Sequence, residues 1–271
     1  METLIIIRSR EELRAFTALA MKKTDNSICF SEYGGTRLLA VAEHAVTTEI
    51  LINYEGKAVS VGVGDRNTDV LAMMGAAHAD GACIYPTIIR TKLDLARDPA
   101  KEGLTLDVKH RKSVVSVPIS RERKTLAHIA DTYHKAIKKF APSVIVTYHG
   151  MHRSYNTDVL LGFGPLHEYI GGKKNAFAFR RVFRTMLNDE LKKRGLTPMT
   201  IKIARSHFTG SKNYTLSHYV KEYNDATRGK RVGIHAEFNR RGRAATGGLP
   251  SVEYQIAAQL LARCAKEWRA L

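Results

Sequence analysis

The chain is poor in cysteine and in long apolar runs. Its 271 residues include three cysteines, Cys29, Cys83 and Cys264, which are widely spaced and form no CxxC pair. Each lies in an apolar segment, so we expect reduced thiols in the core and a cytoplasmic protein. No segment approaches the ~18–20 continuous apolar residues that span a bilayer, and the N-terminus lacks the pattern of a secretion signal. Neither a disulfide framework nor a membrane span is therefore predicted.

Acidic residues are also scarce. The 26 Asp and Glu stand against 43 Lys and Arg, which gives a formal net charge of +17. Such a field attracts anions, from carboxylate substrates to nucleic acid. A solvated surface in a cell with a basic proteome is the alternative explanation. Aromatic residues make up only 8% of the chain, and no RNA- or DNA-binding motif is present. Nucleic acid is kept as a candidate partner, and the oligomeric state is left open.

Strand-like and helix-like patterns alternate through most of the chain. Strands are expected near residues 27–30, 37–42, 58–61, 83–90, 114–117, 143–148, 200–204 and 231–238. Helices are expected near residues 9–23, 68–79, 120–140, 175–194 and 250–268. No repeat or linker divides these elements, so residues 1–271 are predicted to form one domain. The alternation predicts a three-layer α/β fold, with a mostly parallel or mixed sheet and helices on both faces.

Two histidines end short apolar strands. His149 follows the β-branched run 143–148 and precedes Gly150, and His44 follows the apolar run 38–42. Open α/β sheets bind ligands and metals at the carboxyl ends of their strands. The pair therefore predicts a shared metal site, with hydrogen-bonded histidines at two strand-to-loop corners as the alternative.

A carboxylate would complete such a site, because a catalytic zinc takes three protein ligands and keeps one position open. Asp65 lies in a Gly-rich turn just before a predicted helix, and Glu49 follows His44 by five residues. The alternative to metal binding is a turn or N-cap role for Asp65 and a solvated loop position for Glu49. The sequence predicts Zn²⁺, or another divalent metal, held by the two histidines and one of these acids.

Glu237 lies near the end of the alternating strand 231–238, with His235 on the same face. A carboxylate close to a metal site can take a proton from water as general base and pass it to a leaving amine. Glu237 is the candidate for this role. A salt bridge to Arg240 or Arg241 is the alternative.

Several basic side chains are candidates for binding a small carboxylate substrate: Arg90, Arg97, Arg153, His207 and His218. The first two flank Asp94, and a guanidinium grips a carboxylate with two parallel hydrogen bonds. A surface ion-pair ladder is the alternative for this segment. The two histidines belong to a polar, Gly-containing loop that follows a strand, and such loops often close over substrate. Ordinary loop polarity explains them equally well.

Taken in order, these segments resemble the N-formylglutamate amidohydrolase family, which is related to zinc exopeptidases and aspartoacylases. The resemblance covers residues 38 to 260 as islands: 43–45, the stretch around Asp65, 90–97, 148–151, 208–219 and 236–240. It implies a metal-dependent amidohydrolase acting on a small N-acyl amino acid or peptide-like acidic substrate. It assigns the roles as follows: His44, His149 and Asp65 as metal ligands, with Glu49 as the competing carboxylate, Glu237 as general base, and Arg90 and Arg97 as readers of the substrate carboxylate.

The chain departs from the family pattern at two positions. Ala96 stands where the family usually has asparagine, and Ser211 replaces a second glycine. The net charge of +17 is also not a trait that the family predicts. These departures affect the substrate more than the chemistry. Two alternatives are therefore kept: a nucleic-acid-binding protein, and a deacylase acting on an anionic macromolecule such as acylated RNA.

Overall fold

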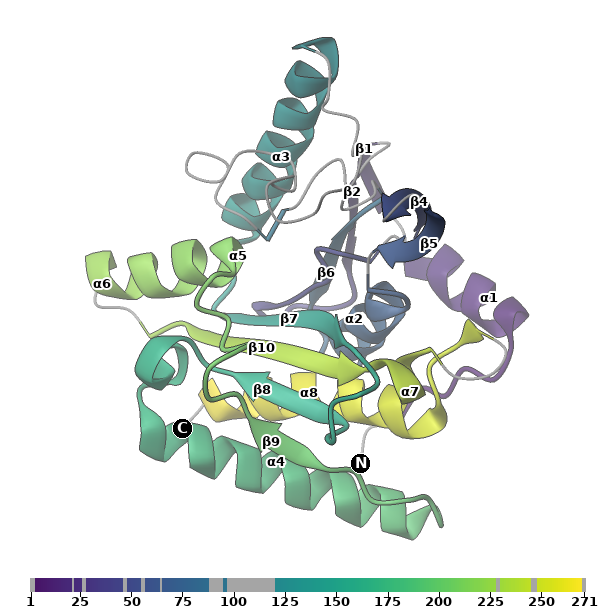
Figure 1. The fold of residues 1–271 in the computed structure, drawn as a ribbon. Coiled ribbons are helices and arrows are strands. Elements are labelled where there is room, and N and C mark those ends of the chain that lie inside the picture. Colours follow the sequence, from purple (N-terminus) through teal and green to yellow (C-terminus); the bar gives the residue numbers. More distant parts are fainter. Residues whose placement is uncertain are drawn as a thin grey trace.

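A mixed eight-stranded sheet runs through the middle of the protein, in a computed structural model with helices on both faces (Figure 1). The structure describes residues 3–20, 22–25, 28–45, 48–54, 57–63, 65–87, 95–96, 120–227, 230–244 and 248–269. In sheet order the strands are β1 (Lys22–Asp25), β2 (Ile28–Glu32), β6 (Ala82–Pro86), β3 (Leu38–Val41), β7 (Val144–Met151), β10 (Val232–Asn239), β8 (Val159–Gly162) and β9 (Ile201–Ile203).

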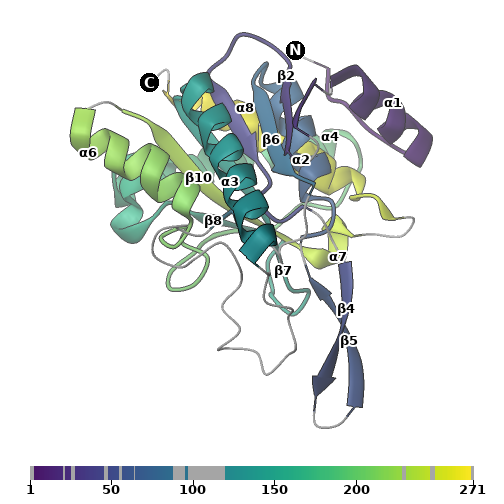
Figure 2. The ribbon, with the colours of Figure 1, turned by 90° about the horizontal axis from the view of Figure 1, so that it is seen from above.

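The four central strands, β6, β3, β7 and β10, run parallel. Antiparallel strands β2 and β8 flank them, β1 pairs antiparallel with β2, and β9 pairs parallel with β8. Strands β4 (Thr48–Tyr54) and β5 (Lys57–Val63) form a separate hairpin that extends away from the main sheet in Figure 2. Parallel strands at the centre bring the carboxyl ends of β3, β7 and β10 to one edge of the sheet.

Helices cover both faces of the sheet. One face packs against α1 (Arg10–Ala20), α2 (Thr68–His78), α4 (Lys173–Lys193) and α8 (Val252–Arg269). The other carries α3 (Ser120–Phe140) and a segment made of α5 (Tyr214–Leu216), the π-helical turn η3 (Ser217–Glu222) and α6 (Tyr223–Thr227). The 3₁₀ helix η2 (Pro165–Ile170) and α7 (Arg240–Arg243) lie in the connections. The predicted three-layer α/β fold is confirmed.

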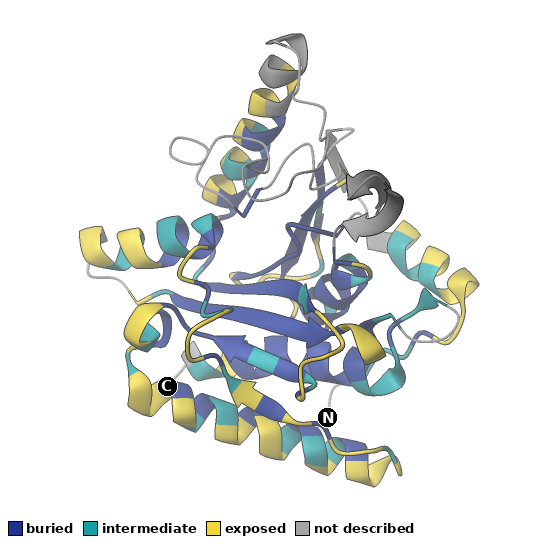
Figure 3. Cartoon of the chain, in the orientation of Figure 1, coloured by how far each residue is buried: buried dark blue, intermediate teal, exposed yellow. Residues whose placement is uncertain are grey.

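Side chains of β7 alternate between the two layers, because successive residues of a strand point to opposite faces. The Tyr148 hydroxyl donates to the carbonyl of Ala258 in α8 over 3.1 Å, whereas Ile145 packs in the core beneath α3. His149 has the parity of Ile145 and therefore faces the layer of α3 and α5. Figure 3 shows β7 and β10 buried along most of their length, so polar groups at their ends are enclosed.

Most helices lie where the sequence predicts them, and the differences have local causes. The N-terminal helix ends at Ala20 rather than near residue 23, because the chain continues into β1 at Lys22. Strands β4 and β8 were not predicted. The polar residues 206–214 and 218, expected as a loop, include the start of α5 and one residue of η3. The Asn213 side chain caps α5 by accepting from Leu216 N over 3.0 Å. The strand expected at 114–117 lies outside the described residues.

All three cysteines are buried and unpaired, as their apolar surroundings predict. Within the described ranges, no helix combines the length and the apolar character needed to cross a bilayer. That residues 1–271 form one domain stays a prediction.

Candidate metal centre

His149 occupies the carboxyl end of β7, where the residue is 4% exposed. It lies in register with Glu237 of the neighbouring parallel strand β10. Residues in register on parallel strands point to the same face of a sheet. The two predicted site residues therefore stand side by side, on the face covered by α3 and α5.

Backbone hydrogen bonds bring Asp65 to His44. The chain turns at residues 43 and 44 directly after β3, and the Asp65 N–H donates to the His44 carbonyl over 2.6 Å. The Thr68 N–H and hydroxyl both donate to the Asp65 carbonyl, over 3.1 and 2.8 Å. Asp65 is thus fixed at the entry to α2, beside a histidine that precedes it by 21 positions in the sequence.

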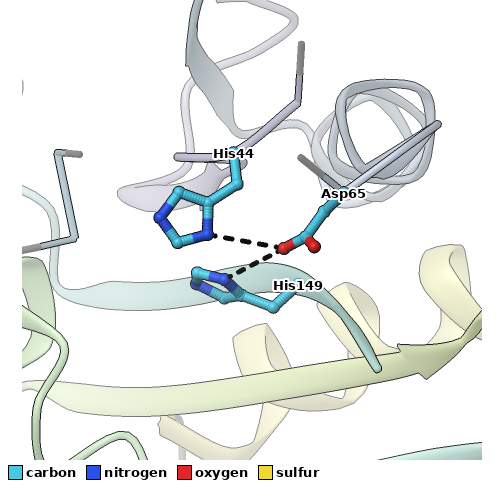
Figure 4. Close-up of side chains that lie close together, drawn as sticks. All are labelled: His44, Asp65 and His149. Carbon is cyan, nitrogen blue, oxygen red and sulfur yellow. Dashed lines mark ion pairs between the residues drawn. The ribbon is translucent and has the colours of Figure 1, made fainter. Parts of the chain in front are cut away.

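His44, Asp65 and His149 form a compact, buried group (Figure 4). Asp65 Oδ2 lies 3.4 Å from His44 Nδ1 and 3.5 Å from His149 Nδ1. One candidate ligand atom from each residue lies within 4.8 Å of the other two. Tetrahedral zinc with bonds of 2.0–2.1 Å requires ligand atoms about 3.3 Å apart. The donor set and its spacing fit a divalent cation with an open position.

Glu43 orients His149 from the other side of the ring. Its Oε2 lies 2.9 Å from His149 Nε2 and accepts from Asn213 Nδ2 over 2.6 Å. The Thr215 hydroxyl donates to Oε1. A carboxylate on one ring nitrogen fixes the orientation of the other, which is how ligand histidines are commonly held. Sequence reasoning missed Glu43, although it immediately precedes His44 at the end of an apolar strand.

The ionisable side chains of this buried group shift one another's pKa values. Burial favours neutral carboxyls, but hydrogen bonds and charges from the histidines outweigh it and lower the pKa of Glu43 and hold that of Asp65 well below its usual range. Burial also opposes a charge on His149, yet Asp65 and Glu43 raise the pKa of His149 to about 10. A proton on His149 therefore balances the carboxylates in the metal-free protein. A bound cation would take over that balance and release the proton.

Glu237 is held by one oxygen and keeps the other unpaired. Its Oε1 lies 3.0 Å from His235 Nε2, and His235 Nδ1 lies 3.0 Å from the Thr147 hydroxyl. The His235 ring packs on that of His149, with centroids 4.4 Å apart. Glu237 Oε2 is buried and has no hydrogen-bond partner among the described residues. An unpaired buried carboxylate oxygen is costly unless a ligand or water uses it.

The alternative salt bridge from Glu237 to Arg240 or Arg241 is not formed among the described residues, where Glu237 pairs with His235. Arg241 instead binds Asp158, with Nη2 donating to Oδ1 over 2.7 Å. Glu237 therefore stays directed to the His149 and His235 side of the site rather than to the surface. Its role as general base stays a prediction.

The remaining predicted residues are exposed, half-buried or outside the described part of the chain. Arg90 and Arg97 fall outside the described residues. The Glu49 backbone belongs to β4, paired with Gly62, and its side chain is not among those described. Arg153 and His207 are exposed. His218 is half-buried in η3, with Nδ1 2.6 Å from Glu222. Their substrate-binding roles stay predictions.

Comparisons with known proteins show that other proteins share the fold of this chain. The chain matches no protein-family model and no curated protein. Two solved structures resemble it over 91% of its length. The first is an N-formylglutamate amidohydrolase from Ralstonia eutropha JMP134, with 15% identity, a TM-score of 0.54 and all of that chain covered. The second is a gene product from Agrobacterium tumefaciens, with 10% identity, a TM-score of 0.59 and 96% of that chain covered.

The chain has the fold of an N-formylglutamate amidohydrolase. This likeness agrees with the resemblance predicted from the order of the sequence motifs. At 15% identity it concerns the fold alone. The chemistry of the protein depends on its own site residues.

Proposed function

We propose that this protein is a metal-dependent hydrolase that cleaves the amide bond of a small N-acyl amino acid or a peptide-like acidic substrate. The observation that carries the proposal is the buried group of His44, Asp65 and His149, with ligand atoms within 4.8 Å of one another. Two imidazoles and one carboxylate at the ends of strands are the donor set of a catalytic zinc. Glu49 is the competing carboxylate in this proposal.

In the proposed site, His44, Asp65 and His149 hold the cation, and Glu43 keeps the His149 ring in place. A divalent cation such as Zn²⁺ would polarise the scissile carbonyl and lower the pKa of a water molecule. The metal must displace the proton of His149, so its binding tightens as the pH rises.

Glu237 serves as general base in this proposal. Its Oε2 is buried without a partner among the described residues, whereas His235 holds Oε1 over 3.0 Å. The unpaired oxygen takes a proton from the attacking water and then gives it to the leaving amine. A carboxylate placed for proton transfer contributes about 10²–10⁴ in rate.

The substrate class rests on charge and on the shared fold. The N-formylglutamate amidohydrolase that shares the fold is named for an N-acylated acidic amino acid. A net charge of +17 favours anionic substrates. The proposed substrate-binding residues are Arg90, Arg97, Arg153, His207 and His218. Free, buried cysteines fit a reducing compartment, so a cytoplasmic location is part of the proposal.

The test is hydrolysis of N-formyl and N-acetyl amino acids, acidic and neutral, by the full-length protein. Exhaustive chelation should abolish activity, and added zinc should restore it. His149→Ala should be inactive, whereas His128→Ala, which removes an exposed histidine of α3, should retain full activity. Full activity in the chelated protein or in His149→Ala would contradict the proposal.

The outer face of α4 supports a second candidate function. Residues 173–185 contain five Lys or Arg and no acid, and Phe177 and Val182 are each 46% exposed. The Arg180 guanidinium lies 6.0 Å from the centre of the Phe177 ring. Both residues line a surface hollow of about 800 Å³ together with Lys173, Lys174, Ala178 and Arg181. Exposed rings among basic side chains are typical of surfaces that bind single-stranded nucleic acid.

In that second proposal, the protein binds RNA or another anionic macromolecule through α4. The macromolecule is either only bound, or it is acylated and serves as the substrate of a deacylase. Phosphate-driven binding weakens steeply with salt. Filter binding of single-stranded RNA and DNA at two salt concentrations tests it. We expect low-salt binding that Lys173→Glu with Arg181→Glu weakens. No binding at low salt removes this candidate and leaves the hydrolase proposal intact.

A further inference from the structure

Arg243 is a buried cation to which the proposed chemistry gives no role. It is the last residue of α7 and is 4% exposed. Its Nη1 donates to the carbonyl of Arg66, and its Nε donates to the carbonyl of Phe238 over 3.3 Å. The guanidinium also covers Gly150, where an added Cβ would lie 2.2 Å from Nη2. One side chain thus contacts three segments that are distant in the sequence.

Each contacted residue directly follows a residue of the site. Arg66 follows Asp65, Gly150 follows His149, and Phe238 follows Glu237. Gly150 and Phe238 are also partners in the register of β7 and β10. Since His149 and Glu237 point to one face of the sheet, their successors point to the other. Arg243 therefore lies behind the site rather than in it.

We propose that Arg243 is a positioning residue that fixes Asp65, His149 and Glu237 relative to one another through the backbone that follows each of them. The use of that arrangement in metal binding rests on the proposed function. The arrangement itself does not depend on it. A guanidinium suits this task because it is planar and presents five N–H donors in a fixed geometry. We name the unit made of Arg243, Gly150, Arg66 and Phe238 the arginine clasp.

A second contact joins the segment of Arg66 to that of Arg243, this time with the donor in the segment of Arg66. The Asn67 side chain donates to the carbonyls of Arg243 and Gly248, each over 2.9 Å. Residues 66 and 67 are therefore tied to residue 243 by both its side chain and its backbone. Attraction to Asp65 and Glu237 offsets part of the burial that lowers the pKa of Arg243. The buried charge is thus compensated by the residues that it positions.

The clasp also explains the glycine that follows His149. Any side chain at position 150 would occupy the space of the guanidinium, whose Nη2, Cζ and Nε lie 2.2, 2.3 and 2.7 Å from an added Cβ. Gly150→Ala should therefore displace Arg243 without altering a site residue. Gly150→Ala perturbs the arginine clasp at its β7 side, and Arg243→Met perturbs it at its α7 side.

The test compares Gly150→Ala, Arg243→Met and the double variant by zinc titration of the full-length protein. Each single variant should bind zinc about 10- to 100-fold more weakly, as expected when support for metal ligands is removed. The double variant should be no weaker than the weaker single variant, since the clasp is lost only once. Gly35→Ala, which adds a Cβ in open space, and the exposed Arg14→Met are the matched controls.

A metal-free readout separates this inference from the proposed function. Long-range ¹H–¹⁵N spectra of the histidine rings should show displaced His149 and His235 signals in Gly150→Ala and Arg243→Met, but not in the controls. Unchanged ring signals and zinc affinity in either folded clasp variant would overturn the inference. Displaced rings in a protein whose wild type binds no zinc would support the clasp and refute the metal site. If Arg243→Met does not fold, Gly150→Ala decides the outcome.

Discussion

Replacing Glu43 by glutamine should weaken metal binding without touching a ligand. The carboxylate of Glu43 is fully enclosed and contacts three polar side chains: His149, Asn213 and Thr215. Glutamine keeps the size but loses the charge, and its NH₂ group cannot accept a hydrogen bond. At least one of the three former partners then faces a donor. His149 also loses the Glu43 carboxylate, which favours a proton on Nε2. With the proton on Nε2, Nδ1 is available to bind the metal.

The magnitude follows from the contacts that are lost. A hydrogen bond to a charged group contributes about 1.5–3 kcal/mol. Loss of the residue that orients a metal ligand typically costs about 10- to 100-fold in affinity. At about 1.4 kcal/mol for each tenfold change, that range corresponds to about 1.4–2.8 kcal/mol. The two estimates agree, so we expect zinc affinity to fall by one to two orders of magnitude in Glu43→Gln.

The assay is a competition titration of zinc against a chromophoric chelator, with thermal unfolding measured on the same samples. Asp189→Asn, which neutralises an exposed acid of α4, is the control for the loss of one negative charge. It should bind zinc like the wild type. A folded Glu43→Gln protein with zinc affinity within twofold of the wild type would refute the argument that Glu43 orients His149.

Three further predictions concern catalysis and pH. Glu237→Gln should lower kcat by about 10²–10⁴ while zinc affinity changes by less than about threefold, as steady-state kinetics and zinc titration would show; a kcat near that of the wild type would exclude Glu237 as the base. Asp158 is partly buried, but hydrogen bonds from Thr200 and Arg241 lower its pKa. Its stabilising contribution is present above the unfolded pKa of about 3.9 and is lost as the pH falls through the lower folded value. The melting temperatures of wild type and Asp158→Asn should therefore converge in acid, and a constant difference would contradict this assignment. In the metal-free protein, the pKa of His149 is raised to about 10, so its contribution is complete below about pH 6.5 and lost as the pH rises towards 10. Urea unfolding between pH 6 and 10 should show that loss in the wild type but not in His149→Ala, and parallel curves would contradict it.

The sequence was sufficient to predict the residues that end strands. His149 and Glu237 were predictable because alternation along a buried strand fixes both the face and the end at which a polar residue appears. The three-layer arrangement followed from the alternation of strands and helices. Asp65 and Glu49 could not be separated in the same way, because the choice depends on a turn. The hydrogen bond from Asp65 N to the His44 carbonyl brings Asp65 beside His44.

The supporting residues were beyond prediction for a different reason. Glu43 precedes Asn213 by 170 positions, and no local pattern joins them. The segment that carries Asn213 was itself expected to be a loop, because short helices begun by a cap carry little periodic signal. Arg243 acts through the space that Gly150 leaves, which becomes visible only when β7 and α7 are packed together.

Anomalous diffraction at the zinc absorption edge, on crystals of the zinc-loaded protein, tests the central claim most directly. We predict one strong peak bonded to His149 Nδ1, an Asp65 carboxylate oxygen and a ring nitrogen of His44, at bond lengths of about 2.0–2.2 Å. Its loss in Asp65→Ala would identify the carboxylate ligand. Zinc bound only at other residues, or no peak at this group in well-ordered crystals, would contradict the account.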